Sequence, residues 1–293
     1  MNRIYRNKPA IFLFLLPAAI LFIGIIIVPI IMSTYYSLHD WNGFSDMKFV
    51  GLDNYIELFT STTINFPKAL LNAVFFMLAS VFIQLPFSLL LALLLAKGRK
   101  GSRLFLSVYF IPVLLSTVVI GQLWLKIYNP DYGILNVALN SIGLESWTKV
   151  WLGDRGTALI AAFIPTLWQY TGYHMLLMYA GIRSVPQELR EAALIDGASE
   201  SQINRRIIIP MIKPIIKVCV IISVTGALKV FDLIYILTNG GPAHATEVPS
   251  TLLVSMMFLR NRYGFGSAIA VILIFLCFLV AYIIRKSFKT EVD

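Results

Sequence analysis

The chain has 293 residues, of which 58% are hydrophobic and 13% are charged. The charged fraction is about half of what soluble domains carry, so the composition excludes an ordinary soluble domain and indicates an integral membrane protein. The net charge of +9 does not indicate nucleic-acid binding, because the basic residues cluster in short segments between apolar runs.

The first apolar stretch, residues 10–37, follows three basic residues and is long enough to cross a bilayer. It is too long for a signal peptide and no small-residue cleavage site follows it, so we expect an uncleaved first helix. The loop 38–66 is polar and aromatic, and its Trp41 suits a membrane interface.

The second apolar stretch, residues 68–96, is interrupted by Asn72 and Gln84. Polar side chains within a bilayer need partners, so these two are expected to face other helices. The basic segment 97–103 reads KGRKGSR and lacks the spacing of a phosphate-binding loop, which favours a solvated cytoplasmic turn. A third span is predicted over 104–126.

The long loop 126–156 contains a segment, residues 132–142, that is predicted to form a short interfacial helix. The fourth span, 157–182, follows it and carries a polar and aromatic face, whose members recur at spacings of three and four. The members of this face are Thr166, Gln169, Tyr170 and Tyr173. Such a face suits sugar hydroxyls and rings, while hydrogen-bonded packing between helices is the open alternative. Trp168 and His174 are expected to be packing residues.

The fifth span, 214–237, is the predicted span with charges inside it, Lys229 and Asp232. Ionisable groups in a bilayer are costly and usually face a cavity or one another, so these two are either substrate contacts or a structural ion pair. Ser223 and Gly226 are the further candidates on this helix. The apolar segment 249–259 is short, and the sixth span is predicted over 263–284.

Cysteine and histidine positions give no sign of a metal site or a disulfide. Cys219 and Cys277 lie inside apolar runs, where buried packing residues are expected. The three histidines are scattered and have no cysteine or acidic partners at ligand spacing. We therefore predict no metal site, no catalytic residue and no cofactor in this chain.

The distribution of basic residues predicts the topology. Fifteen lysines and arginines lie in the N-terminus, 97–103, 182–213 and the C-terminal tail. The loops predicted for the opposite side, 38–66, 126–156 and 238–262, hold 6. Positive charge marks the cytoplasmic side, so both termini and the central loop 183–213 are predicted to be cytoplasmic. The prediction is an all-α integral membrane protein with six transmembrane helices and a single domain over residues 1–293.

The central loop is predicted to contain two short helices. Ser184 is expected to cap the first, because Gln187 follows three residues later. Gly197 ends that helix, since glycine accepts the left-handed backbone found at helix ends. The second helix is expected to start near Ser199 and to continue until Pro210.

This loop resembles the EAA loop of permeases of binding-protein-dependent ABC importers. The family pattern is Glu-Ala-Ala, three residues, Gly, nine residues, Ile, one residue and Leu-Pro, with Ile209 standing here for the usual Leu. The matching residues, which the resemblance implies contact a separate ATPase, are Glu191, Ala192, Ala193, Asp196, Gly197, Ile207 and Pro210. Two further segments, 49–55 and 231–242, are similar to those of the first permease of maltose and glycerol-phosphate importers.

The resemblance implies the type I ABC importer permease fold and transport of a sugar or oligosaccharide into the cytoplasm. The implied partners are a second, homologous permease in a heterodimer, two cytoplasmic ABC ATPases and an extracellular or periplasmic sugar-binding protein. The chain would lie in the bilayer of a bacterial cell membrane and bind no nucleic acid. ATP and Mg would be bound by the partner ATPase, so this chain would not be an enzyme.

A rival hypothesis is an ion-coupled secondary transporter of a small polar solute, driven through Lys229 and Asp232. Such a carrier should show inverted repeats or discontinuous helices. The sequence shows neither, which favours the ATP-driven importer.

Overall fold

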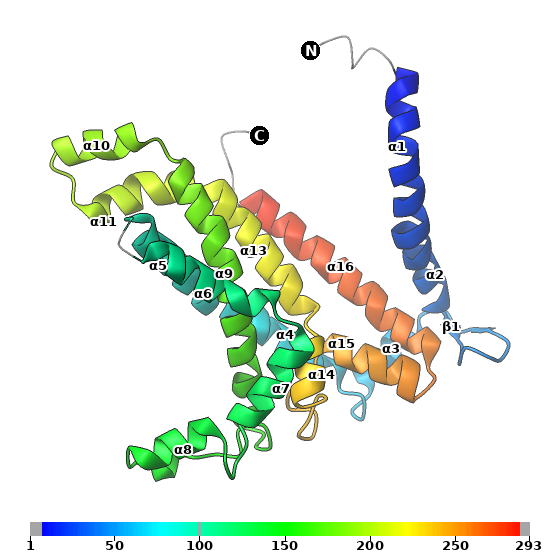
Figure 1. Cartoon of the computed structure of the whole chain (residues 1–293). Coiled ribbons are helices and arrows are strands. Elements are labelled where there is room, and N and C mark those ends of the chain that lie inside the picture. Colours follow the sequence, from blue (N-terminus) through cyan, green and yellow to red (C-terminus); the bar gives the residue numbers. More distant parts are fainter. Residues whose placement is uncertain (1–7, 99–100, 288–293) are drawn as a thin grey trace. The chain divides into compact units, whose positions relative to one another are not determined.

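The computed structural model describes residues 8–98 and 101–287, and these are mostly helical (Figure 1). The predicted all-α class is confirmed, with one departure in the loop 38–66. There β1 (His39–Asp40) pairs antiparallel with β2 (Lys48–Phe49). The residues Arg99 and Lys100 of the predicted basic turn lie outside the described residues.

The chain divides into two compact units. Unit 1 contains Met1–Asn65 and Leu253–Phe275, and unit 2 contains Phe66–Leu252 and Leu276–Asp293. Besides the strands, the α-helices that begin in unit 1 are α1 (Lys8–Phe22), α2 (Val28–Tyr36), α3 (Asp53–Thr60) and α16 (Tyr263–Ser287). Two short π-helical segments, η1 (Ile23–Ile27) and η5 (Ser255–Leu259), also begin there. From Leu276 onwards, α16 belongs to unit 2.

In unit 1 the segment that follows the first span is fastened by two polar contacts. Asn54 donates from Nδ2 to the backbone oxygens of Ser37 and His39, at 2.9 and 3.0 Å. Arg262 donates to both carboxylate oxygens of Glu57, at 2.7 and 2.6 Å. These hydrogen bonds lower the pKa of the Glu57 carboxyl and raise that of the Arg262 guanidinium. The short helix α3 is thus held to the end of α2 and to the start of α16.

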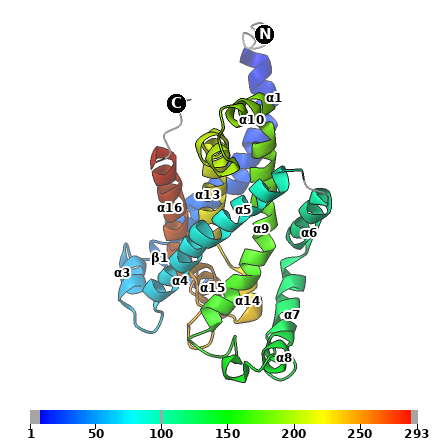
Figure 2. The same cartoon turned by 90° about the vertical axis from the view of Figure 1, so that its left-hand side faces the viewer.

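Unit 2 holds the remaining elements. They are α4 (Phe66–Ala79), η2 (Ser80–Gln84), α5 (Leu85–Ala96), α6 (Ser102–Leu114), α7 (Thr117–Ile127), α8 (Ile134–Ser141), η3 (Glu145–Trp147), α9 (Ala158–Ser184), α10 (Gln187–Ile195), α11 (Glu200–Ile203), η4 (Asn204–Ile208), α12 (Ile209–Met211), α13 (Lys213–Leu228), α14 (Asp232–Leu237) and α15 (Pro249–Val254). The helices α10 and α11 lie at one end of α9 and α8 lies at the other (Figures 1 and 2).

The helix α9 is central to unit 2, where it packs against α5, α6, α13 and α14. Its close approach to α6 requires Gly172, because a Cβ there would lie 1.8 Å from the backbone oxygen of Tyr109. One buried cluster surrounds Phe163 and a second surrounds Met175, so α9 passes through both. The predicted packing role of Cys219 is confirmed by its burial in the second cluster.

Within the described ranges, four helical stretches are long and apolar enough to cross a membrane: Ile11–Tyr36, Phe66–Ala96, Lys213–Leu237 and Tyr263–Ser287. A fifth is formed if α6 and α7, which meet at an angle of 99°, count as one broken span. The helix α9 occupies the predicted fourth span but is not among these four, because a polar and aromatic stretch from Thr166 to His174 lies in its middle. The six-span count and the bounds of the spans therefore stay predictions.

The stretch predicted as the fifth span is interrupted once, because the backbone leaves the helical conformation from Lys229 to Phe231, between α13 and α14. The predicted cap of the first helix in the central loop was wrong. Ser184 does not cap α10, since its Oγ donates back to the carbonyl of Gly181 and the residue ends α9 instead. Pro186 occupies the N-cap position of α10 without a side-chain hydrogen bond.

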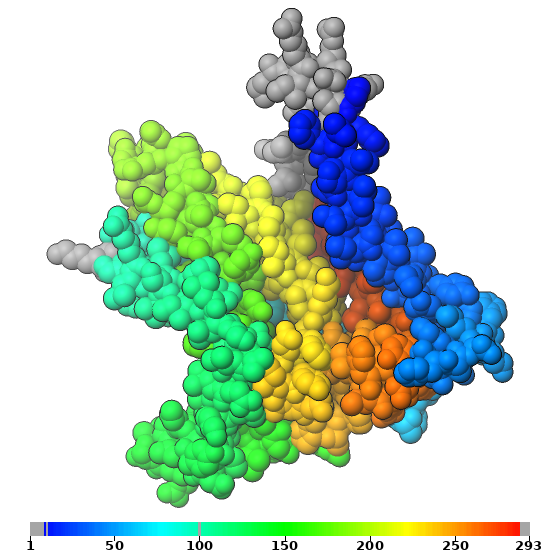
Figure 3. All heavy atoms as spheres, turned by 45° about the vertical axis from the view of Figure 1, so that its right-hand side comes forward, coloured from blue at the N-terminus to red at the C-terminus, as the bar shows by residue number. Residues whose placement is uncertain are grey.

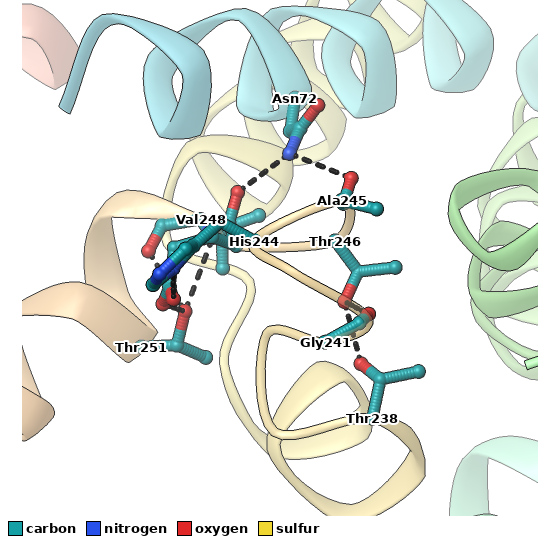
Figure 4. A network of polar contacts seen from close by, with 9 residues as sticks. Asn72, Thr238, Gly241, His244, Ala245, Thr246, Val248 and Thr251 are labelled. Carbon is teal, nitrogen blue, oxygen red and sulfur yellow. Dashed lines mark hydrogen bonds and ion pairs between the residues drawn. The ribbon is translucent and has the colours of Figure 1, made fainter. Parts of the chain in front are cut away.

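The polar residues of the second span have partners; Gln84 faces another helix as predicted, whereas Asn72 faces a loop. Gln84 donates to the carbonyls of Thr166 and Leu167 on α9. Asn72 donates to the backbone oxygens of Ala245 and Glu247, at 3.0 and 2.8 Å (Figure 4). The loop that follows α14 is therefore attached to α4 through one amide group.

Candidate functional site

A cavity of about 440 Å³ lies within unit 2, lined by α4, η2, α6, α7, α9, α13 and α14. All eight residues that the sequence predicted for a substrate pathway line it. They are Thr166, Gln169, Tyr170, Tyr173, Ser223, Gly226, Lys229 and Asp232. The shared face of the fourth span and the polar positions of the fifth thus open into the same space.

Three buried polar side chains that line the cavity carry atoms without a hydrogen-bond partner among the described residues. They are Gln169, His174 and Ser223, which are 3%, 3% and 7% exposed, through Oε1, Nδ1 and Oγ respectively. A buried polar atom left without a partner costs about 1–3 kcal/mol. Such an arrangement is suited to a ligand that supplies the missing donors and acceptors, and hydroxyl groups supply both.

The break between α13 and α14 places both charged residues of the fifth span at the cavity. Lys229 ends α13 and Asp232 starts α14. They form no ion pair within 4.0 Å among the described residues, so the structure does not bring them together as the structural pair that was one alternative. Both side chains are exposed in this chain and line the cavity.

The sequence did not identify the contribution of the helices before α9. Ser80 and Gln84 of η2 and Thr117 of α7 line the cavity too. His174, which was expected to be a packing residue, is buried and also lines the cavity. Trp168 is absent from the described lining, and its ring meets that of Trp124 edge-on at 6.1 Å.

The bend of the central loop follows from Gly197. Its φ of +78° is left-handed, and α10 ends there in a Schellman motif. The amide of Ala198 donates to the carbonyl of Ala193 at 2.9 Å, and the amide of Gly197 donates to the carbonyl of Leu194 at 3.1 Å. Among the described residues, nothing lies within 4 Å of the place that a Cβ on Gly197 would take.

The second helix of the loop starts at Ser199, as predicted. Ser199 and Gln202 form a capping box, in which each side chain accepts a hydrogen bond from the other's backbone amide. The helical path then continues through η4 and α12, and Pro210 lies in the first turn of α12 instead of ending the helix. Two helices therefore meet at a bend (Figure 1), and their atoms are the yellow-green spheres on the surface of unit 2 in Figure 3.

The seven predicted coupling residues divide into two groups. Ala193 and Ile207 pack against the second buried cluster of unit 2 and hold the loop to it. The exposed ones are Glu191, Ala192, Asp196, Gly197 and Pro210. Glu191 accepts a hydrogen bond from Gln187 at 2.6 Å. Asp196 and Gly197 also border a small hollow of about 240 Å³ at the bend.

The chain belongs to the family of binding-protein-dependent transport system inner membrane components, which matches residues 84–292. It is therefore a membrane permease, which is a transport component. The break between α13 and α14 would also fit an ion-coupled carrier, but membership of this family places the chain among ABC permeases.

Individual relatives agree with this assignment. The chain is 40% identical over 288 residues to the probable ABC transporter permease protein YurN of Bacillus subtilis, covering 97% of this chain and 98% of that protein. It is 34% identical to the trehalose/maltose transport system permease protein MalF of Thermococcus litoralis, covering 98% and 97%. A subunit of a bacterial alginate ABC transporter has the same fold, with a TM-score of 0.83, 23% identity and coverage of 96% and 94%.

Proposed function

We propose that this chain forms one half of the membrane pathway of an ATP-driven importer of a sugar or oligosaccharide. The observation that carries the proposal is the cavity of unit 2, where eight positions predicted from the sequence converge and buried polar atoms lack partners. Relatives named for trehalose/maltose transport and for a multiple sugar-binding transport system support the substrate class.

The cavity offers the two kinds of contact that saccharides need. Gln169 and Ser223 provide hydrogen-bonding groups for hydroxyls. Tyr170 and Tyr173 provide aromatic rings with a polar tip, against which a sugar ring can pack. Lys229 and Asp232 add unpaired charges that can hydrogen-bond to hydroxyls or to a charged substituent.

The exposed bend around Gly197 is the proposed contact with a separate ATPase. A helix end with small residues and no overlying side chain lets another protein approach closely. In this proposal two ATPases hydrolyse ATP bound with Mg, a second homologous permease completes the pathway, and an extracellular binding protein delivers the substrate. The loop 183–213 and both termini then lie on the cytoplasmic side.

The test is reconstitution of the whole transporter in vesicles with the second permease, the ATPase and the binding protein. Uptake of labelled oligosaccharides is measured with and without ATP, for the wild type and for Gln169→Leu. The expected result is ATP-dependent uptake of at least one saccharide, which the variant weakens. Uptake of an ion or amino acid in place of every saccharide tested would overturn the substrate class.

A further inference from the structure

Glu200 lies at the centre of an ionic cluster that joins three helices. Arg190 of α10 donates from Nη2 to both carboxylate oxygens of Glu200, at 2.8 Å each. The Nζ of Lys97, the residue that follows α5, lies 3.7 Å from Glu200 Oε2. The cluster therefore links the two helices on either side of the bend to each other and to the end of α5.

The cluster is half-buried, not fully solvated. The side chains of Lys97, Arg190 and Glu200 are 31%, 33% and 40% exposed. Hydrogen bonding to Arg190, opposed in part by burial, lowers the pKa of the Glu200 carboxyl, so the group is ionised at neutral pH. A single exposed ion pair contributes little to stability, so the position of this cluster in the fold matters more than its contribution to stability.

Lys97 connects the ionic cluster to the end of α5. The helix α5 continues without a break from η2, whose Gln84 lines the cavity. Ser88 of α5 also donates to the carbonyl of Thr171 on α9, at 3.0 Å. The ionic cluster therefore contacts one end of the continuous helical path η2–α5, and the other end of that path, η2, borders the cavity.

We propose that Glu200 is a positioning residue that fixes the angle between α10 and α11 and connects both to α5, so that movement of the loop reaches the cavity. The inference rests on the proposed coupling role of the loop. Glu200 and Arg190 do not belong to the EAA pattern, and neither touches the cavity lining among the described residues.

The experiment measures ATP hydrolysis and substrate uptake in the same reconstituted vesicles and compares uptake per ATP. Glu200→Gln keeps the volume and removes the charge. Its matched control is Glu188→Gln, because Glu188 is an exposed carboxylate on α10 with no ion pair among the described residues. We expect Glu200→Gln to assemble with the ATPase and to lower uptake per ATP by about threefold to tenfold, a range typical of coupling mutations.

Charge reversal separates a specific role from a general loss of structure. Arg190→Glu with Glu200→Arg restores the pair between α10 and α11 but places like charges at Lys97. Adding Lys97→Glu restores both contacts. The expected order of uptake per ATP is the triple variant above the double variant, and the double variant above Arg190→Glu alone.

Two results would overturn the proposal: equal uptake per ATP for Glu200→Gln and Glu188→Gln, or a triple variant no better than the double. Failure of the coupling loop itself has a different signature. If Gly197→Val leaves ATPase binding and uptake unchanged, the proposed function of the loop is wrong, whatever the Glu200 variants do.

Discussion

The cavity and the central loop differ in whether their polar side chains have hydrogen-bond or ion-pair partners. In the cavity, buried atoms of Gln169 and Ser223 have no partner among the described residues, and Lys229 and Asp232 form no ion pair there. In the loop, Arg190 and Glu200 pair with each other, and Ser199 closes a capping box.

In our proposal this difference separates a surface that binds a small ligand from a surface that transmits movement. Buried polar groups without partners raise the free energy of the protein until a ligand supplies the missing hydrogen bonds. Ligand binding is therefore expected to stabilise the cavity. Groups that already satisfy one another hold two helices at a fixed angle. A rigid loop can transmit the movement of a docked partner, which a flexible loop would absorb.

The largest expected effect comes from the bend. In Gly197→Val the left-handed backbone costs about 1 kcal/mol, while the surrounding space in this chain is open, so the protein should still fold and insert. Uptake should fall to background, because the added side chain occupies the surface where the ATPase is proposed to dock. Co-purification of the ATPase and uptake are measured in the same cells.

Gly197→Ala is the control for backbone strain, since it has the same φ restriction with less bulk. It should retain more uptake than the valine variant. Glu191→Arg tests the same surface by charge, and normal uptake with a full complement of ATPase in both Gly197→Val and Glu191→Arg would remove the loop from the mechanism.

A smaller effect is expected in the cavity. Tyr173→Ala or Gln169→Ala should lower uptake about tenfold or change the preference among saccharides, since a lost hydrogen bond or stacking contact is worth about 1–1.5 kcal/mol. Assembly with the ATPase should be unchanged. Trp168→Phe serves as the control, because Trp168 lies on the same helix but outside the described lining. Unchanged uptake and unchanged ATPase stimulation in both alanine variants would contradict the assignment.

The topology can be tested without any transport. A cysteine in place of Gly98 or Ser199 should react with an impermeant reagent only from the cytoplasmic side, because the basic residues concentrate there. A cysteine at Ser141, in the exposed end of α8, should react from outside. Labelling of either of the first two positions in intact cells would reverse the proposed orientation.

The smallest effect concerns pH. Arg190 lowers the pKa of the Glu200 carboxyl. The carboxylate therefore contributes to folding stability above its unfolded pKa of about 4.3, and this contribution disappears as the pH falls through the lowered folded value. An exposed pair contributes about 0.5 kcal/mol. The difference in thermal unfolding between wild type and Glu200→Gln should stay constant from pH 7 to 5 and shrink as the pH falls below the unfolded pKa. A difference that grows on acidification would mean that the pair does not stabilise the fold.

Much of this account could be predicted from the sequence where local chemistry decides the outcome. Gly197 ends α10 because glycine tolerates the left-handed backbone, and Ser199 starts the next helix because its hydroxyl accepts from Gln202. The helix face of Thr166, Gln169 and Tyr173 follows from a spacing of three and four. The same kind of reasoning failed at Ser184, where the preceding helix was longer than the apolar pattern indicated.

The remaining features depend on contacts between distant segments. The cavity role of His174 depends on where α13 passes α9, which no local pattern records. The break at Lys229 lies within a stretch apolar enough to be one span, so composition gave no reason to divide it. The pairing of Arg190 with Glu200 depends on the angle between α10 and α11. The motif gives the position of the bend along the chain but not this angle.

The most direct test of the division between cavity and loop is one experiment on two variants. Gln169→Leu and Gly197→Val are reconstituted with the same partners, and ATP hydrolysis and uptake are followed at rising substrate concentration. The account predicts that Gln169→Leu keeps the ATPase bound and needs a higher substrate concentration, whereas Gly197→Val loses uptake at every concentration. A Gly197→Val transporter rescued by more substrate, or a Gln169→Leu transporter that loses its ATPase, would contradict it.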